Sequence, residues 1–285
     1  MLDPIPVKNE AHSMNRRDLG RMLGLGTASG VLLAAAAAPQ IAQAQAAGRS
    51  RLAQILERGT IRIGTTGDFN PMSFRDPGSN EYRGFDIEAM TQLAADMGTR
   101  IEWVQTEWAT LVAGIAAGRF DIFSGASVSM ARARTAAFSI PYLELGTVPL
   151  ALKANAGKFR TWESINDPGV RVATFMGTVF EEQAKAHFPR AQLRAVQAPA
   201  TGFQEVLAGR ADVTITSTIE ASSLVRRFDQ LTLLGENVRP RNRRPLAFVV
   251  AQDEPTWLNF VNTWVSLKTT EGFFEALEAK WLPKA

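Results

Sequence analysis

The chain has 285 residues, no cysteine, 46% hydrophobic residues and a formal net charge of +3 at pH 7. The lack of cysteine excludes disulfides, thiolate metal sites and a lipid-modified cysteine. The small and scattered net charge argues against nucleic acid as a partner, so the composition indicates a soluble globular protein.

The first 46 residues read as an export signal that is removed from the mature protein. The segment NRRDLGR at 15–21 precedes an apolar stretch at 22–38, and small residues at alternate positions around 42–46 fit a cleavage site. The paired arginines resemble a twin-arginine signal, which predicts a periplasmic location. An uncleaved membrane anchor is the alternative, although the stretch is rich in alanine rather than strongly apolar.

The remaining chain alternates strand-like and helical patterns. Strands are expected at 61–64, 101–104, 120–123, 170–175, 193–196 and 213–216. Helices are expected between them at 86–97, 111–117, 178–187 and 201–208. This alternation favours an α/β fold whose mostly parallel sheets are covered by helices.

Two apolar segments, 147–152 and 246–251, flank a self-contained block and read as strands that cross between two lobes. We therefore predict lobe 1 over 47–148 and 249–285, and lobe 2 over 149–248. A terminal helix follows the second crossing, and its aromatic residues, with Trp257, Trp264 and Phe274 among them, stand at the helical spacing typical of core packing.

Four segments together resemble the periplasmic solute-binding proteins that serve amino-acid ABC importers. They are RIGTTGDFNP at 62–71, GFDIE at 84–88, GRFDI at 118–122, and RARTAAFSIPYL at 132–143. The resemblance implies a two-lobed type II periplasmic-binding-protein fold with two crossover strands as its hinge. It also implies a monomer that holds a small carboxylate ligand without cofactor or metal, and that hands the ligand to a membrane permease.

The phrases TTGDF, RGFDIE and FSIPYL also resemble the periplasmic cyclohexadienyl dehydratases, which are enzymes on the same scaffold. A dehydratase that acts on prephenate or arogenate is therefore the alternative function. Other catalytic arrangements lack support, because His187 is the only histidine after residue 46 and a histidine-based triad or metal cluster needs more.

Arg132 and Arg134 raise the question of which arginine serves the site. Residues two apart on a helical turn point to nearly opposite sides, so at most one of the pair faces a given site. A guanidinium suits a carboxylate, because its planar fork donates two parallel hydrogen bonds. The resemblance assigns the carboxylate to Arg132 and leaves Arg134 on the surface; the plainer alternative is that both are solvated.

The resemblance assigns further ligand contacts, each with a structural alternative. Gly125 and Ser127 would approach the carboxylate, although Gly-Ala-Ser is otherwise an ordinary turn. Thr178, before a helix, would meet the carboxylate from lobe 2 or simply cap that helix. Phe69 and Trp108 would form apolar walls, with core burial as the alternative for Trp108. Asp68 would contact the ligand or stabilise its own turn.

Ser217 departs from the amino-acid binders, which have an aspartate there that pairs with the ligand ammonium. A hydroxyl cannot neutralise a buried cation. The departure therefore favours a keto, hydroxy or aromatic acid, although an amino-acid-like ligand stays open.

A second departure concerns the dehydratases, whose catalytic carboxylate follows the Gly-Thr at the start of the lobe 2 helix. Here Phe180 takes that position. Glu181 and Glu182 are the nearest acids. Glu181 comes one residue late, and one residue along a helix is a rotation of about 100°, so its side chain would point in another direction. A first-turn acid favoured by the helix dipole is the alternative for Glu181.

Overall fold

The computed structural model describes residues 49–234 and 239–282, so the predicted export signal lies outside the described residues. Residues from Ser50 onward form one compact unit. Among the helices that the structure describes, none is both long and apolar enough to cross a membrane.

The described chain is built on one mixed ten-stranded sheet. Its main path runs β10 (Gln192–Val196), β9 (Arg171–Phe175), β11 (Val213–Ser217), β8 (Leu143–Leu152), β13 (Arg241–Ala251), β6 (Ile122–Ser127), β1 (Thr60–Thr65) and β5 (Arg100–Gln105). Two short strands lie off this path: β12 (Leu231–Leu233) pairs with β8, and β7 (Ala136–Phe138) pairs with β13. The two long central strands pair antiparallel with each other and with their neighbours.

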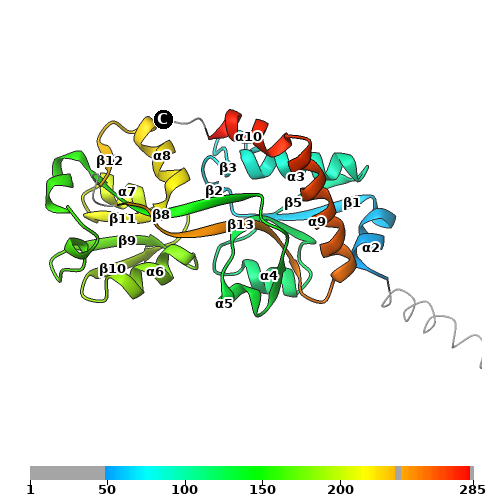
Figure 1. The fold of residues 1–285 in the computed structure, drawn as a ribbon, viewed down its shortest axis with the longest axis horizontal. Coiled ribbons are helices and arrows are strands. Elements are labelled where there is room, and N and C mark those ends of the chain that lie inside the picture. Colours follow the sequence, from blue (N-terminus) through cyan, green and yellow to red (C-terminus); the bar gives the residue numbers. More distant parts are fainter. Residues whose placement is uncertain (1–48, 235–238, 283–285) are drawn as a thin grey trace, which may run out of the picture. The chain divides into compact units, whose positions relative to one another are not determined.

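The outer strands form two parallel groups, one on each side of β8 and β13. We call the group β1, β5 and β6 lobe 1, and the group β9, β10 and β11 lobe 2. All six residues of β6 are buried. Strands buried in this way belong to parallel sheets with helices over them. Figure 1 shows β8 and β13 running through the middle from one lobe to the other.

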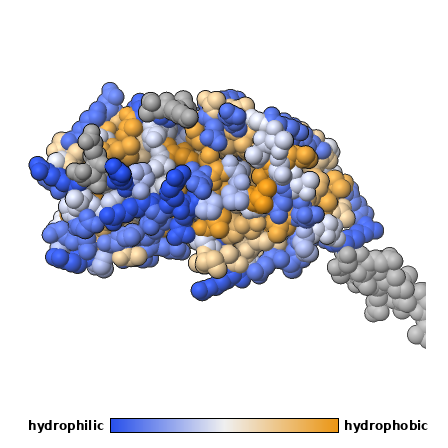
Figure 2. Space-filling view, in the orientation of Figure 1, coloured by the Kyte–Doolittle hydropathy of each residue, from blue (hydrophilic) through white to orange (hydrophobic). Residues whose placement is uncertain are grey.

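Helices cover each lobe. Lobe 1 carries α2 (Arg51–Arg58), α3 (Phe85–Asp96), α4 (Leu111–Ala116), α5 (Met130–Ala133), α9 (Pro255–Thr270) and α10 (Phe273–Trp281). Lobe 2 carries α6 (Val179–His187), α7 (Gly202–Leu207), α8 (Thr218–Arg227) and two 3-10 helices, Lys153–Lys158 and Glu163–Ile165. A small sheet of β2 (Asp68–Phe69), β3 (Ser73–Arg75) and β4 (Tyr82–Arg83) adjoins lobe 1. In Figure 2 hydrophobic residues gather around the middle of the face seen in Figure 1.

The architecture confirms the predicted fold class, an α/β type II fold with two lobes. The two segments predicted to cross between the lobes are β8 and β13. The predicted lobe boundaries near 148 and 248 fall inside these two strands, and the exact boundaries stay a prediction. The terminal helix differs from expectation, because it divides into α9 and α10 at Gly272, whose φ is +74°. Its aromatic residues pack into the core as expected, with Trp257, Trp264 and Phe274 all buried.

Candidate functional site

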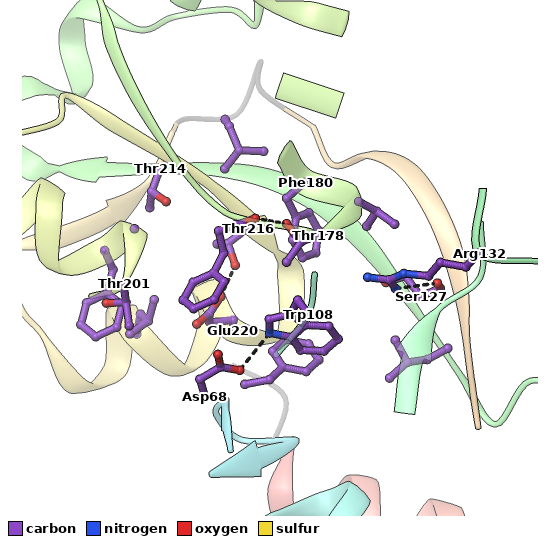
Figure 3. Close-up of a pocket in the computed structure, with 18 residues that line it drawn as sticks. Asp68, Trp108, Ser127, Arg132, Thr178, Phe180, Thr201, Thr214, Thr216 and Glu220 are labelled. Carbon is purple, nitrogen blue, oxygen red and sulfur yellow. Dashed lines mark hydrogen bonds between the residues drawn. The ribbon is translucent and has the colours of Figure 1, made fainter. Parts of the chain in front are cut away.

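A cavity opens between the two lobes. Lobe 1 and β2 contribute Asp68, Phe69, Trp108, Ser127 and Arg132, and lobe 2 contributes Phe175, Thr178, Phe180, Phe203, Thr216 and Glu220 among others. The space between these atoms, counting the part open to solvent, is about 670 Å³. Figure 3 shows these side chains around it.

Arg132 is the only cationic residue among those described that line this cavity. It lies on the short helix α5, whose first turn is capped by the Ser129 hydroxyl. Its guanidinium donates from Nη1 to the Ser127 carbonyl oxygen at 3.1 Å and from Nη2 to the Gly177 carbonyl oxygen at 3.1 Å. These bonds fix the direction of the guanidinium and join a lobe 1 side chain to the lobe 2 backbone.

The Arg132 guanidinium is buried without an ion pair to any carboxylate of the described residues. The residue is 8% exposed. Burial lowers the pKa of Arg132 to about 10, because removal from water disfavours the charged form. Glu182 offsets the pKa shift in part, whereas the positive charge of Arg244 adds to it. A buried cation of this kind is stabilised by an anion placed in the cavity.

Arg134 lies elsewhere. Its side chain is exposed, while that of Arg132 is buried two residues earlier on the same turn. The opposite-face geometry expected from the sequence is therefore present, and only Arg132 reaches the cavity.

Trp108 forms a wall between the positive and negative parts of the cavity. The Arg132 Cζ lies 5.8 Å from the Trp108 ring centroid, and the indole Nε1 donates to Asp68 Oδ1 at 2.9 Å. Phe69 packs edge-on against the same indole at 5.9 Å between centroids. Trp108 lies in the turn before α4, and it is half-buried.

Ser127 and Thr178 also line the cavity, and some polar groups of each are already hydrogen-bonded within the protein. The Ser127 carbonyl oxygen holds Arg132. The Thr178 hydroxyl donates to the Phe175 carbonyl oxygen at 2.6 Å and accepts from the Glu181 N–H at 3.3 Å. The helix-capping role, one of two alternatives for Thr178, is therefore present beside its place at the cavity.

Gly125 and Ser217, both predicted as ligand contacts, do not line the cavity. A Cβ at Gly125 would lie 2.2 Å from Tyr142 Oη and 2.6 Å from Asp86 Oδ2, so the glycine makes room for the buried Asp86–Tyr142 hydrogen bond. Ser217 is fully buried, and its hydroxyl accepts from the Glu220 N–H at 3.0 Å as the cap of α8. Both residues serve the scaffold that surrounds the site.

Glu181 and Glu182, the acids considered for a dehydratase, also lie outside the cavity. Glu181 accepts from the Gly177 N–H at 2.7 Å and from Lys185 Nζ at 2.6 Å. Burial by itself would raise the pKa of Glu181, but these two hydrogen bonds outweigh it and hold the pKa below its usual value. Glu182 is exposed on the next position of α6.

Glu220 is a cavity residue that the sequence analysis missed. It lies in the first turn of α8, three residues after Ser217, and accepts a hydrogen bond from the Thr216 hydroxyl. Burial raises the pKa of Glu220 to about 7; the Thr216 hydrogen bond lowers it and the charge of Asp68 raises it further. In sequence, an acid at this position reads as a helix-dipole residue, so no signal separates it from an ordinary cap.

Asp68 faces the same part of the cavity from β2. Burial raises the pKa of Asp68; the Thr66 side chain and the hydrogen bond from Trp108 lower it in part, and the nearby charge of Glu107 raises it. Figure 3 places Asp68 and Glu220 together, on the side of Trp108 away from Arg132. The cavity thus has a cationic end, an aromatic middle and an acidic end.

Comparisons with known proteins cover most of the chain. The family model of bacterial extracellular solute-binding proteins, family 3, matches residues 61–284. A cyclohexadienyl dehydratase of Pseudomonas aeruginosa is 34% identical over 82% of this chain and 86% of its own length. The L-cystine-binding protein TcyJ of Escherichia coli is 27% identical over 94% of this chain and 97% of its own.

A solved structure has the same fold. It is an ancestral amino-acid-binding protein described as a precursor of cyclohexadienyl dehydratase. It is 34% identical, with a TM-score of 0.76, and the match covers 82% of this chain and 99% of that one.

Proposed function

Since the chain belongs to the bacterial extracellular solute-binding proteins, family 3, we propose that it is a receptor that closes two lobes around a small carboxylate and delivers it to the permease of an ABC importer. The observation that carries the proposal is Arg132, a buried guanidinium at the cavity without a carboxylate partner among the described residues. The ligand supplies that partner.

The hydrogen bonds of Arg132 leave donors for the ligand. A guanidinium has five N–H donors, and the carbonyl oxygens of Ser127 and Gly177 accept from one on Nη1 and one on Nη2. The remaining donors match a carboxylate in two parallel bonds. A phosphate, with its larger negative charge, fits less well, because Asp68 and Glu220 line the same cavity.

The contacts between the lobes support capture by closure. Arg132 reaches the Gly177 carbonyl oxygen across the cavity, and Gln197 Nε2 donates to Glu107 Oε2 at its margin. Because Arg132 serves both the ligand and the opposite lobe, ligand binding favours the closed arrangement. Hinge closure of this kind needs no chemical step.

The location follows from residues 1–46, whose twin-arginine pattern supports export to the periplasm. In the periplasm the receptor, as a monomer, would bind its solute and then dock on the membrane permease. Export of a reporter fused to residues 1–46, compared with an Arg16→Lys, Arg17→Lys variant, tests this step.

Titration calorimetry of the purified protein with a library of small carboxylates tests the proposed function. We expect micromolar or tighter binding of at least one carboxylate, and its loss in Arg132→Ala. Failure of every carboxylate to bind would refute the receptor proposal.

A dehydratase is the second candidate, favoured by the 34% identity to a cyclohexadienyl dehydratase and by Glu220 at the cavity. Loss of a hydroxyl needs a proton donor, and a carboxyl whose pKa is about 7 is protonated in about half of the molecules at pH 7. Glu220 would fill that role better than Glu181 or Glu182. Incubation with prephenate, with phenylpyruvate formation as the readout, tests this second candidate. Turnover by the wild type that is lost in Glu220→Gln would support a dehydratase, and no turnover by the wild type would refute it.

A further inference from the structure

We propose that Asp68 and Glu220 form a cation subsite at the end of the cavity remote from Arg132, so that the ligand carries an ammonium or guanidinium group distant from its carboxylate. The inference rests on the proposed function, because it names the ligand class of the same site. Basic amino acids and ω-amino acids have this chemistry.

The two acids approach the cavity from opposite lobes. Asp68 lies on β2 beside lobe 1, and Glu220 lies on α8 of lobe 2. Their charges interact, since Asp68 raises the pKa of Glu220. Neither acid forms an ion pair with a cation among the described residues, and the hydrogen bonds that they accept come from neutral groups, namely the indole of Trp108 and the hydroxyl of Thr216. A cation between the two carboxylates would relieve their repulsion.

The charges of the cavity match such a ligand. Its described lining has one cation, Arg132, and two acids, Asp68 and Glu220. A keto acid or fatty acid would pair Arg132 and leave both acids without a counter-charge. A ligand with one carboxylate and a distal cation pairs both ends of the cavity, and a buried charge without a partner is costly.

The spacing decides which cation of an amino acid reaches the acids. The Trp108 indole separates the two ends, because its ring faces Arg132 while its Nε1 donates to Asp68. An α-ammonium is attached to the carbon next to the carboxylate, so it stays near Arg132 and does not span an indole. A cation at the end of a side chain does, and its methylene groups would pack on Phe69, Phe180 and Trp108.

This inference replaces the expectation of a ligand without a cation. That expectation assumed that the Ser217 hydroxyl faces the ligand. The structure uses the hydroxyl to cap α8, and the acid of the same helix turn, Glu220, lines the cavity instead. The missing aspartate therefore bears on an α-ammonium and not on a cation at the far end of the ligand.

Calorimetry with four six-carbon probes tests the subsite: hexanoate, 6-aminohexanoate, norleucine and lysine. They share a carboxylate and differ in the α-ammonium and the terminal ammonium independently. We expect the terminal ammonium to tighten binding at least about tenfold in both pairs, lysine over norleucine and 6-aminohexanoate over hexanoate. In Asp68→Asn, Glu220→Gln this gain should fall to about threefold or less, while Glu278→Gln, an exposed acid on α10, should keep it.

The outcomes separate the two proposals. If norleucine and hexanoate bind as tightly as their terminal-ammonium counterparts, and Arg132→Ala weakens all four, the receptor stands and the cation subsite is wrong. A gain from the terminal ammonium that persists in the double variant also overturns the subsite. If no probe binds and the library shows no other carboxylate ligand, both proposals fail.

Discussion

Arg132 Nη2 on α5 donates a hydrogen bond of 3.1 Å to the carbonyl oxygen of Gly177, in the turn that precedes α6. One side chain thus lines the cavity from lobe 1 and holds the backbone of lobe 2. Both the proposed binding and the proposed closure depend on this residue.

Loss of the Arg132 guanidinium should cost binding, whereas loss of its neighbour should not. We expect Arg132→Ala to weaken carboxylate binding by about 2 to 4 kcal/mol, because a charge-assisted pair in a buried site is lost. Arg132→Lys should also bind weakly, since an ammonium cannot reproduce the fork. Arg134→Ala, at an exposed position, is the matched control. Calorimetry measures all three, and equal affinity of Arg132→Ala and wild type would contradict the assignment.

Gly177 should be needed for closure rather than for folding alone. A Cβ there would lie 2.4 Å from the backbone nitrogen of Ala109 in lobe 1, and its φ is +74°. Gly209 has a similar φ of +68°, but a Cβ there meets nothing within 4 Å. Both Gly→Ala changes should therefore cost about 1 kcal/mol of stability through backbone strain.

Only Gly177→Ala should also weaken ligand binding, by about tenfold or more, since the new methyl group blocks the approach of the lobes. Urea unfolding and calorimetry on the two variants separate the effects. Equal ligand affinity in Gly177→Ala and Gly209→Ala would show that this contact does not control closure.

The raised pKa of Glu220 should make stability depend on pH. Its pKa goes from 4.5, the ordinary value, to about 7 in the folded protein. A folded-state pKa above the unfolded one contributes stability that is present below pH 4.5 and is lost as pH rises through 7. Glu220→Gln cannot ionise, so it should gain about 1 to 3 kcal/mol relative to wild type between pH 4.5 and 8.

Urea unfolding of wild type and Glu220→Gln across this range measures the difference. The buried Asp86, whose pKa is raised to about 8 by burial, titrates in both proteins and cancels from the comparison. A stability difference that stays constant with pH would mean that Glu220 is not perturbed in the folded protein.

Gly125 should prove a packing residue. We expect Gly125→Ala to lower the free energy of unfolding by about 1 to 3 kcal/mol, because its Cβ would overlap Tyr142 Oη. Tyr142→Phe removes that oxygen, so the double variant should lose less than the sum of the two single changes. Additive losses in thermal unfolding would contradict this contact.

The sequence predicted the helices and strands well where apolar residues form a continuous run or recur at a regular spacing. The apolar runs of β1, β9 and β11 and the spacing along α3 lie within a residue or two of the observed bounds. Residues fixed by local geometry were also predictable: Arg132 and Arg134 point apart because they are two positions apart on one turn.

The rest of the site depends on contacts that no local pattern reports. Gly125 is constrained by Asp86 and Tyr142, which come from α3 and from the segment before β8. Glu220 reaches the cavity because α8 packs where Asp68 of the other lobe faces it, and an acid after a serine cap looks the same on any surface helix. Six of the eight residues that the resemblance assigns to ligand contacts line the cavity, but the resemblance did not identify the roles of Gly125 and Glu220.

The central claim is that this protein holds a small carboxylate through Arg132. Mass spectrometry of the small molecules released when the purified protein is denatured, for wild type and Arg132→Ala side by side, tests it most directly. We expect wild type to release a carboxylate in near-stoichiometric amount and Arg132→Ala, still folded, to release little or none. Release of the same carboxylate in the same amount by both proteins would contradict the account.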